Sequence, residues 1–194
     1  MQIIANNISK SYNGFEFVIK NFSYSFNHSN CYCITGNNGS GKSTLLRLLA
    51  GLSQPTSGTI RYEECGKNTL GYVAPAMNLY EDLTVKELCE FQFSAQTVAS
   101  FSREMIEKYE LDTLMNKPIR SLSSGQKQRV KLFVASSNQP DILLLDEPST
   151  NLDNRGFSII EKIVDDYKKS QKIIIIASNV QNEIDLTNVQ IPLQ

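Results

Sequence analysis

The sequence predicts an α/β fold with a mostly parallel sheet, an N-terminal antiparallel β layer and an inserted helical subdomain. The first of three observations is a glycine-rich loop that follows an apolar strand at residues 31–35 and precedes a helix. The second is the continuous apolar character of residues 141–146 and 172–177, which is typical of strands buried in a parallel sheet. The third is the helical spacing of apolar residues that begins at residue 84.

The N-terminal half is expected to supply the antiparallel layer and one buried helix. Short strands are expected at residues 3–8, 15–19 and 22–26, with the turn-forming pair Asn13-Gly14 between the first two. The helix after the glycine-rich loop runs from residue 44 to 50 and ends at Gly51. It is apolar almost all round, which predicts burial between two layers. Further strands are expected at residues 59–62 and 70–73.

The C-terminal half contains most of the expected helices. They cover residues 84–98, where Thr84 and Glu87 form a capping box, then 102–109, 124–137 and 154–169. We therefore expect one domain over residues 1–194, with a core at 1–75 and 140–194 and a helical lobe at 76–139.

Composition limits the partners and the compartment. The 194 residues carry 19 basic and 20 acidic side chains, a net charge of -1, so no nucleic acid is expected as a partner. The small basic clusters at 127–131 and 168–169 are interpreted as solvated helix faces. The N-terminal residues lack the features of a secretory signal, and no run approaches the roughly 20 apolar residues of a membrane helix. A cytoplasmic protein is expected.

The four cysteines, at positions 31, 33, 65 and 89, are expected to be reduced thiols in that compartment. Cys31 and Cys33 share one face of a strand, so a two-thiolate metal site is one interpretation. No histidine or further cysteine lies near them in the sequence to complete such a site. Burial as small apolar side chains is the interpretation we favour.

The glycine-rich loop has the spacing of a phosphate-binding loop, Gly-x4-Gly-Lys-Ser, which predicts a P-loop NTPase core. Its backbone N–H groups can surround a polyphosphate at the start of the helix. The Lys42 ammonium can reach the β- and γ-phosphates, and the Ser43 hydroxyl can ligate Mg²⁺. The expected nucleotide-binding residues of this loop are Gly36, Asn37, Asn38, Gly39, Ser40, Gly41, Lys42, Ser43 and Thr44.

Two acidic residues end the strand at 141–146 and are expected beside the phosphate-binding loop. In an open α/β sheet, ligands bind at the carboxyl ends of the strands. Asp146 is therefore the second predicted magnesium ligand, direct or through water. Glu147 is the predicted catalytic base that polarises the attacking water. A surface acid at a turn is the alternative for this pair.

With these motifs in order, the chain resembles the ABC-type ATPases, the nucleotide-binding subunits of ATP-binding-cassette transporters. The segment 122–126, Leu-Ser-Ser-Gly-Gln, matches the signature loop of that family, and 151–153, Asn-Leu-Asp, matches its D-loop. The resemblance implies ATP and a head-to-tail dimer, formed with itself or a related ABC subunit, in which the signature loop covers the partner's nucleotide. The nucleotide-contacting residues that it implies there are Ser123, Ser124, Gly125, Gln126 and Asp153.

The same resemblance assigns an adenine-stacking aromatic near the N-terminus. Tyr12 is the residue at that position, and Phe15 or Phe17 are alternatives, as is a role for all three in the core. The preference for ATP over GTP rests on this resemblance alone.

Three positions depart from the family's pattern. Ser124 replaces the usual first glycine of the signature loop. Pro75 stands where the family carries a glutamine that contacts Mg²⁺. Asn179 stands where it carries a histidine that touches the γ-phosphate, so Asn179 is a predicted catalytic residue beside Lys42 and Glu147. An asparagine amide can donate a hydrogen bond but cannot carry charge, so turnover is expected to be slow. His28, the one histidine, is expected in a turn.

The resemblance therefore implies an Mg²⁺-dependent ATPase that energises separately encoded, integral membrane transporter subunits from the inner face of the membrane. The helical lobe 83–120 and the loop 74–82 would form the docking surface, with Tyr80, Phe91 and Phe93 as candidate contacts or core residues. A regulatory subunit that hydrolyses ATP slowly and a soluble ABC ATPase outside transport are the alternatives. The sequence does not indicate the transported substrate or its direction.

Overall fold

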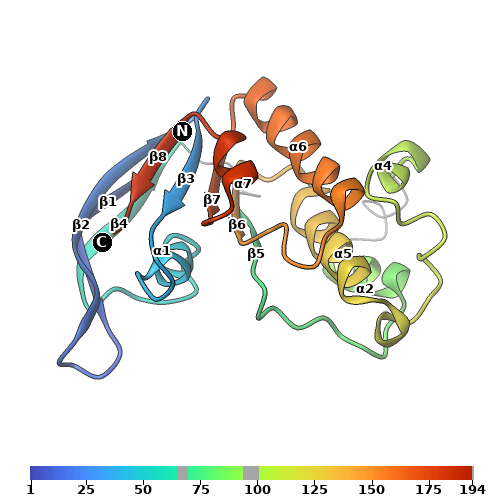
Figure 1. Cartoon of the computed structure of the whole chain (residues 1–194), viewed down its shortest axis with the longest axis horizontal. Helices are drawn as coiled ribbons and strands as arrows, with labels where there is room; N and C mark the ends of the chain where they lie inside the picture. The colour runs from blue at the N-terminus through green and yellow to red at the C-terminus, as the bar shows by residue number, and fades with distance from the viewer. Residues whose placement is uncertain (65–69, 94–100, 194) are drawn as a thin grey trace.

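The computed structural model describes residues 1–64, 70–93 and 101–193, and the chain forms two sheets with helices around them (Figure 1). The outer sheet is antiparallel, in the order β2-β1-β4. The inner sheet is parallel, in the order β5-β6-β7-β3-β8. The strands are β1 (Gln2–Ser11), β2 (Phe17–Asn27), β3 (Cys31–Thr35), β4 (Ser57–Glu63), β5 (Leu70–Val73), β6 (Ile142–Asp146), β7 (Ile173–Ala177) and β8 (Val189–Pro192). The α/β prediction with an N-terminal antiparallel layer is confirmed.

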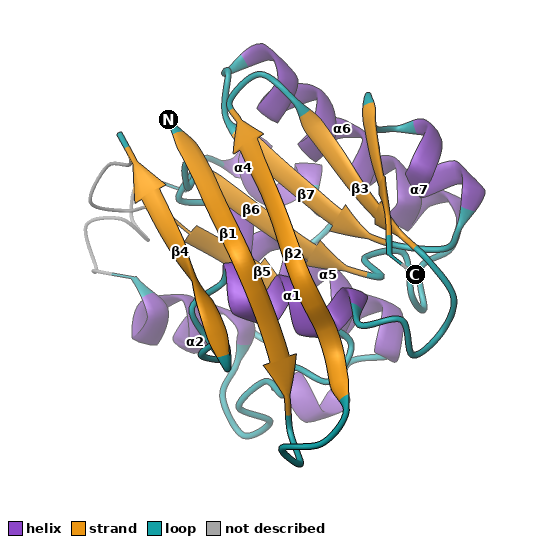
Figure 2. Ribbon diagram, turned by 90° about the vertical axis from the view of Figure 1, so that its left-hand side faces the viewer, coloured by secondary structure: helices purple, strands orange, loops and turns teal. Residues whose placement is uncertain are grey.

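The helices divide between the two faces of the inner sheet. In Figure 2 the outer sheet lies in front, with α1 (Lys42–Leu49) behind it. On the other face lie α5 (Ser124–Ser136) and α6 (Asn154–Lys169), and the lobe adds α2 (Val85–Gln92) and α4 (Arg103–Lys108) (Figure 1). A short 3₁₀ helix, η1 (Ile119–Ser121), precedes the turn into α5, and α7 (Gln181–Asp185) follows β7.

The central strands are buried on both faces, which explains their unbroken apolar sequence. Along β6, Ile142 and Leu144 pack in the core beneath the outer sheet, whereas Leu143 and Leu145 pack in the core with α5 and α6. Strand β7 alternates in the same way. Because successive strand side chains point to opposite faces, one continuous apolar run serves both cores. The four leucines of α1 are at most 1 % exposed, as expected for a helix between layers.

The structure corrects the predicted strands of the N-terminal layer. The predicted strands 15–19 and 22–26 form one strand, β2, and Phe15 lies before it in the hairpin turn with 89 % of its surface exposed. The polar interruption at Asn21 is a residue with φ of 50°, and the register against β1 shifts around it. The Asn21 N–H donates to Ser9 Oγ at 2.9 Å, so an irregularity within the strand had the sequence pattern of a strand end.

Helix starts agree closely with the capping residues. Thr84 and Glu87 form the predicted capping box of α2, and Asn154–Lys169 is helical as predicted. Helix α2 ends at Gln92, and the predicted continuation at 94–98 lies outside the described residues. The short elements α7 and β8 were not predicted, because five and four residues are too few for a periodic pattern.

The cysteines are buried thiols where the structure describes them. Cys31, Cys33 and Cys89 are free and buried, and burial raises the pKa of the Cys33 thiol to about 12. Cys65 lies outside the described residues. The part of the chain that is described holds no group of three His, Cys, Asp or Glu side chains suited to a metal ion. His28 lies in the turn after β2, as expected.

Candidate nucleotide-binding site

The carboxyl ends of three neighbouring strands bring the predicted catalytic segments together. In the inner sheet β7 lies between β6 and β3, and Ala177 pairs with both Asp146 and Ile34. The loop after β3, the segment after β7 and the turn after β6 therefore leave the same edge side by side. Asn179 Nδ2 donates to Asn38 Oδ1 at 3.0 Å, so the segment after β7 touches the phosphate-binding loop.

The backbone of the loop 36–43 includes a glycine conformation that shapes the start of α1. Gly41 is the N-cap of α1 with φ of 97°, a conformation that residues with a Cβ rarely adopt. A Cβ at Gly41 would also lie 2.8 Å from Ile19 Cδ1 and 2.9 Å from the Val18 oxygen. The Lys42 side chain is held inside the loop, where Nζ donates to the Gly36 oxygen at 2.6 Å and the Asn37 oxygen at 3.1 Å. The ammonium is thus positioned in the loop that the sequence predicts to bind phosphate.

Asp146 and Ser43 have the character expected of magnesium ligands. Asp146 is 3 % exposed, and its Oδ1 has no hydrogen-bond partner among the described residues. Burial raises the pKa of this carboxyl group, and a hydrogen bond from Ser43 opposes that shift. A buried carboxylate oxygen without a partner, beside a serine hydroxyl, fits the oxygen ligands that Mg²⁺ prefers.

Glu147 begins the turn after β6 and is exposed, unlike Asp146. Its φ is 46°, in the left-handed region, and its backbone N–H donates to the Ala177 oxygen at 2.9 Å. The change in backbone direction separates the two acids, since Asp146 stays buried while Glu147 reaches solvent at the sheet edge. Their placement fits one metal ligand and one base for water.

Tyr12 lies beside the helix that follows the phosphate-binding loop. Its hydroxyl is 3.5 Å from Thr44 Oγ1, its ring is 61 % exposed, and Lys10 Nζ lies 5.1 Å from the ring centroid. Phe15 and Phe17 are also exposed, at 89 % and 49 %. An exposed ring next to the loop is available for stacking on a base.

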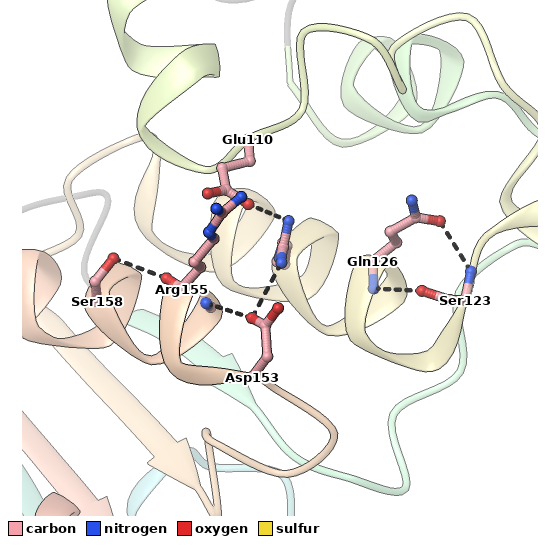
Figure 3. Close-up of polar contacts among 8 residues, drawn as sticks. Glu110, Ser123, Gln126, Asp153, Arg155 and Ser158 are labelled. Carbon is pink, nitrogen blue, oxygen red and sulfur yellow. Dashed lines mark hydrogen bonds and ion pairs between the residues drawn. The ribbon is translucent and has the colours of Figure 1, made fainter.

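The signature loop forms a turn at the start of α5, here called the signature turn, and its polar groups bond to one another within this chain (Figure 3). Ser123 Oγ accepts from the Gln126 N–H at 3.2 Å, and Gln126 Oε1 accepts from the Ser123 N–H at 3.0 Å. Ser124 is exposed, which explains how its side chain is accommodated. A Cβ at Gly125 would lie 2.7 Å from the Asn151 oxygen, so the signature turn packs against the D-loop backbone.

Asp153 is engaged inside its own chain, as Figure 3 shows. Its Oδ1 accepts from the Gly156 N–H at 2.7 Å as the N-cap of α6. The same oxygen accepts from Arg129 Nη2 at 3.3 Å, and Arg129 also pairs with Glu110. These bonds lower the pKa of Asp153, first through the Gly156 N–H. Arg129 is a contact that sequence reasoning missed.

Two other buried polar residues beside the site were also missed. Gln128, 3 % exposed, donates from Nε2 to the Pro148 oxygen at 2.9 Å. Glu183, which is fully buried, accepts at Oε1 from the Ser149 N–H at 2.7 Å. Gln128 precedes the buried Leu132 by four positions, so it lies on the inward face of α5. That spacing was the one feature of the sequence that could have indicated a buried Gln128, and no such feature indicated Glu183.

Within the ranges that the structure describes, every helix is too short or too polar to cross a bilayer.

Comparisons with known proteins agree with this geometry. The family model described as "ABC transporter" matches residues 19–150. The "Lantibiotic transport ATP-binding protein SrtF" of Streptococcus pyogenes is 29% identical over 185 residues, 92% of this chain and 80% of that protein. The "Cytochrome c biogenesis ATP-binding export protein CcmA" of Rickettsia conorii (strain ATCC VR-613 / Malish 7) is 32% identical over 156 residues, 78% of this chain and 82% of its own length.

A similar solved structure is the dimeric post-hydrolysis state of the ATP-binding cassette MJ0796 bound to ADP and Pi. The two share a TM-score of 0.87 at 25% sequence identity, over 99% of this chain and 94% of that one.

Proposed function

Because the chain belongs to the ABC transporter family, we propose that it binds and hydrolyses ATP as a dimer and thereby energises transport by separately encoded membrane subunits. The observation that carries the proposal is the single sheet edge at which the phosphate-binding loop, the two acids after β6 and Asn179 lie side by side. Within this function the chain acts as one domain, with a core at 1–75 and 140–194 and a helical lobe at 76–139.

Each residue of that edge has a chemical role in the proposal. The backbone of residues 36–44 and the Lys42 ammonium bind the phosphates, and Tyr12 stacks on the adenine. Ser43 and Asp146 would hold Mg²⁺, which would supply positive charge to balance the phosphates. Glu147 accepts a proton from the attacking water, and Asn179 donates a hydrogen bond toward the γ-phosphate. The unpartnered Oδ1 of Asp146 supports the metal assignment.

The signature turn supplies the second half of each site from a partner subunit. Ser123, Ser124, Gly125, Gln126 and Asp153 contact the nucleotide held by the other subunit, which is a second copy or a related ABC subunit. The N-terminus of α5 offers backbone N–H groups and a positive dipole end to that phosphate. The dimeric state in which the MJ0796 cassette was solved supports the formation of a dimer.

The membrane partner docks on the helical lobe and on the loop before it, and this places the protein at the inner face of the membrane. Tyr80 and Phe91 are 60 % and 68 % exposed and form an edge-to-face pair with ring centroids 5.3 Å apart. An exposed aromatic pair favours a protein contact. Phe93 is less suited, because it packs against the core beside Phe101. A hollow of about 540 Å³, lined in part by Leu52, Met77 and Leu79, lies beside this loop.

Hydrolysis is proposed to be slow because two polar groups of the family's pattern are replaced. Pro75 has no side-chain ligand, and its oxygen accepts from Lys131 Nζ at 3.1 Å. Asn179 keeps one donor beside the loop but has no charge. Loss of one preorganised donor costs on the order of 100- to 1000-fold in rate. A regulatory subunit that holds ATP is the second candidate, and these two positions favour it.

The hydrolysis assignment is tested by the Glu147→Gln variant. We expect it to lose at least 100-fold in steady-state turnover and to accumulate as an ATP-bound dimer in gel filtration, since the base is gone while binding remains. The Asn179→His variant should turn over ATP faster than the native protein does. A native protein as slow as Glu147→Gln would favour the regulatory candidate.

The transport assignment is tested separately by mild detergent extraction of native membranes. Co-purification with a membrane-spanning subunit is expected. Recovery with ribosomes or DNA would instead favour an ABC ATPase outside transport.

A further inference from the structure

The turn that carries Glu147 has a backbone that must be held in place by its neighbours. Glu147 has φ of 46°, which residues with a Cβ adopt infrequently. Such a conformation persists where surrounding contacts fix it from several sides. The main chain supplies two contacts to Glu147 itself, from its N–H to the Ala177 oxygen at 2.9 Å and from the Thr150 N–H to its oxygen at 3.1 Å. The Leu152 N–H donates to the Ser149 oxygen at 2.9 Å, whereas the Pro148 oxygen and the Ser149 N–H are bonded to side chains.

Gln128 contacts the turn from α5, the helix that begins with the signature turn and is called the signature helix below. Its side chain is 3 % exposed and donates from Nε2 to the Pro148 oxygen at 2.9 Å. Pro148 follows Glu147 directly, so this bond fixes the peptide next to the catalytic carboxylate. Gln128 lies in the second turn of α5, whose first turn is the signature turn. A shift of α5 therefore moves the contact on the Glu147 turn.

Glu183 contacts the same turn from α7, which follows β7. It lies on α7, four residues after Asn179, and its Oε1 accepts from the Ser149 N–H at 2.7 Å. The side chain is fully buried, and Oε2 has no partner among the described residues. Burial of a carboxyl group with one oxygen unpaired is unfavourable for folding. Its presence at a catalytic turn is better explained by positioning than by stability.

We propose that Gln128 and Glu183 are positioning residues that clamp residues 147–149, and so link the Glu147 carboxylate to the signature helix and to the segment of Asn179. The inference rests on the proposed function, because it takes Glu147 as the base. Neither side chain touches nucleotide. Their removal should therefore lower kcat and leave ATP affinity unchanged, since the phosphate-binding loop is not altered.

The first test compares two substitutions of Glu183. Glu183→Met removes the acceptor and keeps an unbranched side chain of similar length, and kcat should fall on the order of 100-fold, as for a catalytic group displaced by about 1 Å. Glu183→Gln keeps an amide oxygen that can accept from Ser149, so it should retain most of the native rate. Glu183→Met leaves the Ser149 N–H without its acceptor, which lowers stability as well, so kcat is compared at a temperature where the thermal midpoint shows each variant to be folded.

The second test uses Gln128→Met with Gln181→Met as the matched control. Gln181 is an exposed glutamine on α7 whose side chain bonds only to Asp185 in the described structure. Gln128→Met should lower kcat about tenfold with KM for ATP unchanged, in proportion to the loss of one buried hydrogen bond. Gln181→Met should match the native protein. An equal kcat in all four variants would overturn the proposal.

Exchange of the Ser149 amide hydrogen, measured by NMR, tests the clamp without hydrolysis. Glu183→Met should accelerate that exchange, whereas Glu183→Gln should not. Unchanged exchange in Glu183→Met would overturn the proposal even in an active enzyme. A native protein that binds ATP but does not turn it over would contradict the hydrolysis assignment instead, and the exchange result would then decide whether the clamp exists.

Discussion

The phosphate-binding edge and the signature turn differ in how their polar groups are satisfied. At the edge, Lys42 and Asp146 are nearly buried, and Asp146 keeps an oxygen without a partner in the described structure. At the signature turn, Ser123 is exposed and forms a reciprocal capping box with Gln126. The phosphate-binding edge therefore has a buried carboxylate oxygen for which the described part of its own chain supplies no partner. The polar groups of the signature turn already have partners in the capping box.

This difference leads to a prediction of which half of the proposed site determines nucleotide affinity. Preorganised, desolvated groups interact strongly with charge, because little reorganisation is needed when the ligand binds. An exposed, self-capped helix start gains less from a ligand unless a second surface removes the water around it. The edge should therefore bind nucleotide in a single subunit, whereas the signature turn should matter only in the dimer. The four predictions below test that division.

The largest effect is expected for Lys42→Ala. Removal of one partner of a buried charge pair costs several kcal/mol, so ATP affinity should fall about 1000-fold in isothermal titration, and no ATP-dependent dimer should form. Lys162→Ala, at an exposed position of α6, is the control and should bind normally. Retained dimerisation in Lys42→Ala would mean that the signature turn contributes to binding without the edge.

The second prediction separates the two regions directly, with Ser123→Ala. ATP affinity of the single subunit should be unchanged, and the ATP-dependent dimer should weaken about 100-fold, because each of two sites loses a hydrogen bond to a charged group. Ser102→Ala is the matched control, since Ser102 caps α4 in the same way through the Met105 N–H at 3.0 Å. Both variants lose about 1 kcal/mol of capping energy. Equal dimerisation in both would remove Ser123 from the interface.

The same division separates what the sequence predicts from what it does not. Local signals predict the phosphate-binding loop, from its glycine pattern, and the two acids Asp146 and Glu147, from the unbroken apolar strand that precedes them. The structure has these strands where they are predicted. Asn179 was predicted from the resemblance, as the residue in place of the family's histidine, and its bond to Asn38 puts it beside the phosphate-binding loop.

Contacts between distant elements were not predictable. Gln128 to Pro148 and Glu183 to Ser149 join segments 20 and 34 residues apart through single buried side chains, for which periodicity has no signature. The break predicted within β2 is wrong because it relied on a local pattern alone. The polar residue Asn21 suggested the end of a strand, whereas pairing with β1 continues the strand past it.

The third prediction concerns the choice of stacking residue at the edge. Tyr12→Ala should weaken ATP binding about tenfold, the typical contribution of one aromatic stacked on a base. Tyr12→Phe should retain affinity, since the ring remains. Phe15→Ala and Phe17→Ala test the alternatives left open by the sequence, and we expect both to bind ATP normally. Loss of affinity in either phenylalanine variant, with Tyr12→Ala unaffected, would move the base-binding role to the hairpin tip.

The smallest effect is a gain in stability from Asp146→Asn without nucleotide or Mg²⁺. Because burial raises the pKa of Asp146, the native state binds more protons than the unfolded state above the ordinary carboxyl pKa. The free energy of unfolding therefore falls as pH rises from the ordinary carboxyl pKa through the raised pKa of the folded protein. Asp146→Asn should gain about 1 kcal/mol at pH 7 in urea denaturation, a common size for stabilising substitutions, and less as pH falls toward that pKa.

The Mg²⁺ dependence of this last variant connects stability to the site. Mg²⁺ and ATP together should raise the unfolding free energy of the native protein and have little effect on Asp146→Asn, because a ligand that binds only the folded state stabilises it by mass action. Asp141→Asn, directly before the first residue of the same strand, is the control and should respond to ligand as the native protein does. A loss of stability in ligand-free Asp146→Asn at pH 7 would mean that the buried carboxylate is already compensated within its own chain. The edge would then resemble the signature turn in being satisfied before nucleotide binds.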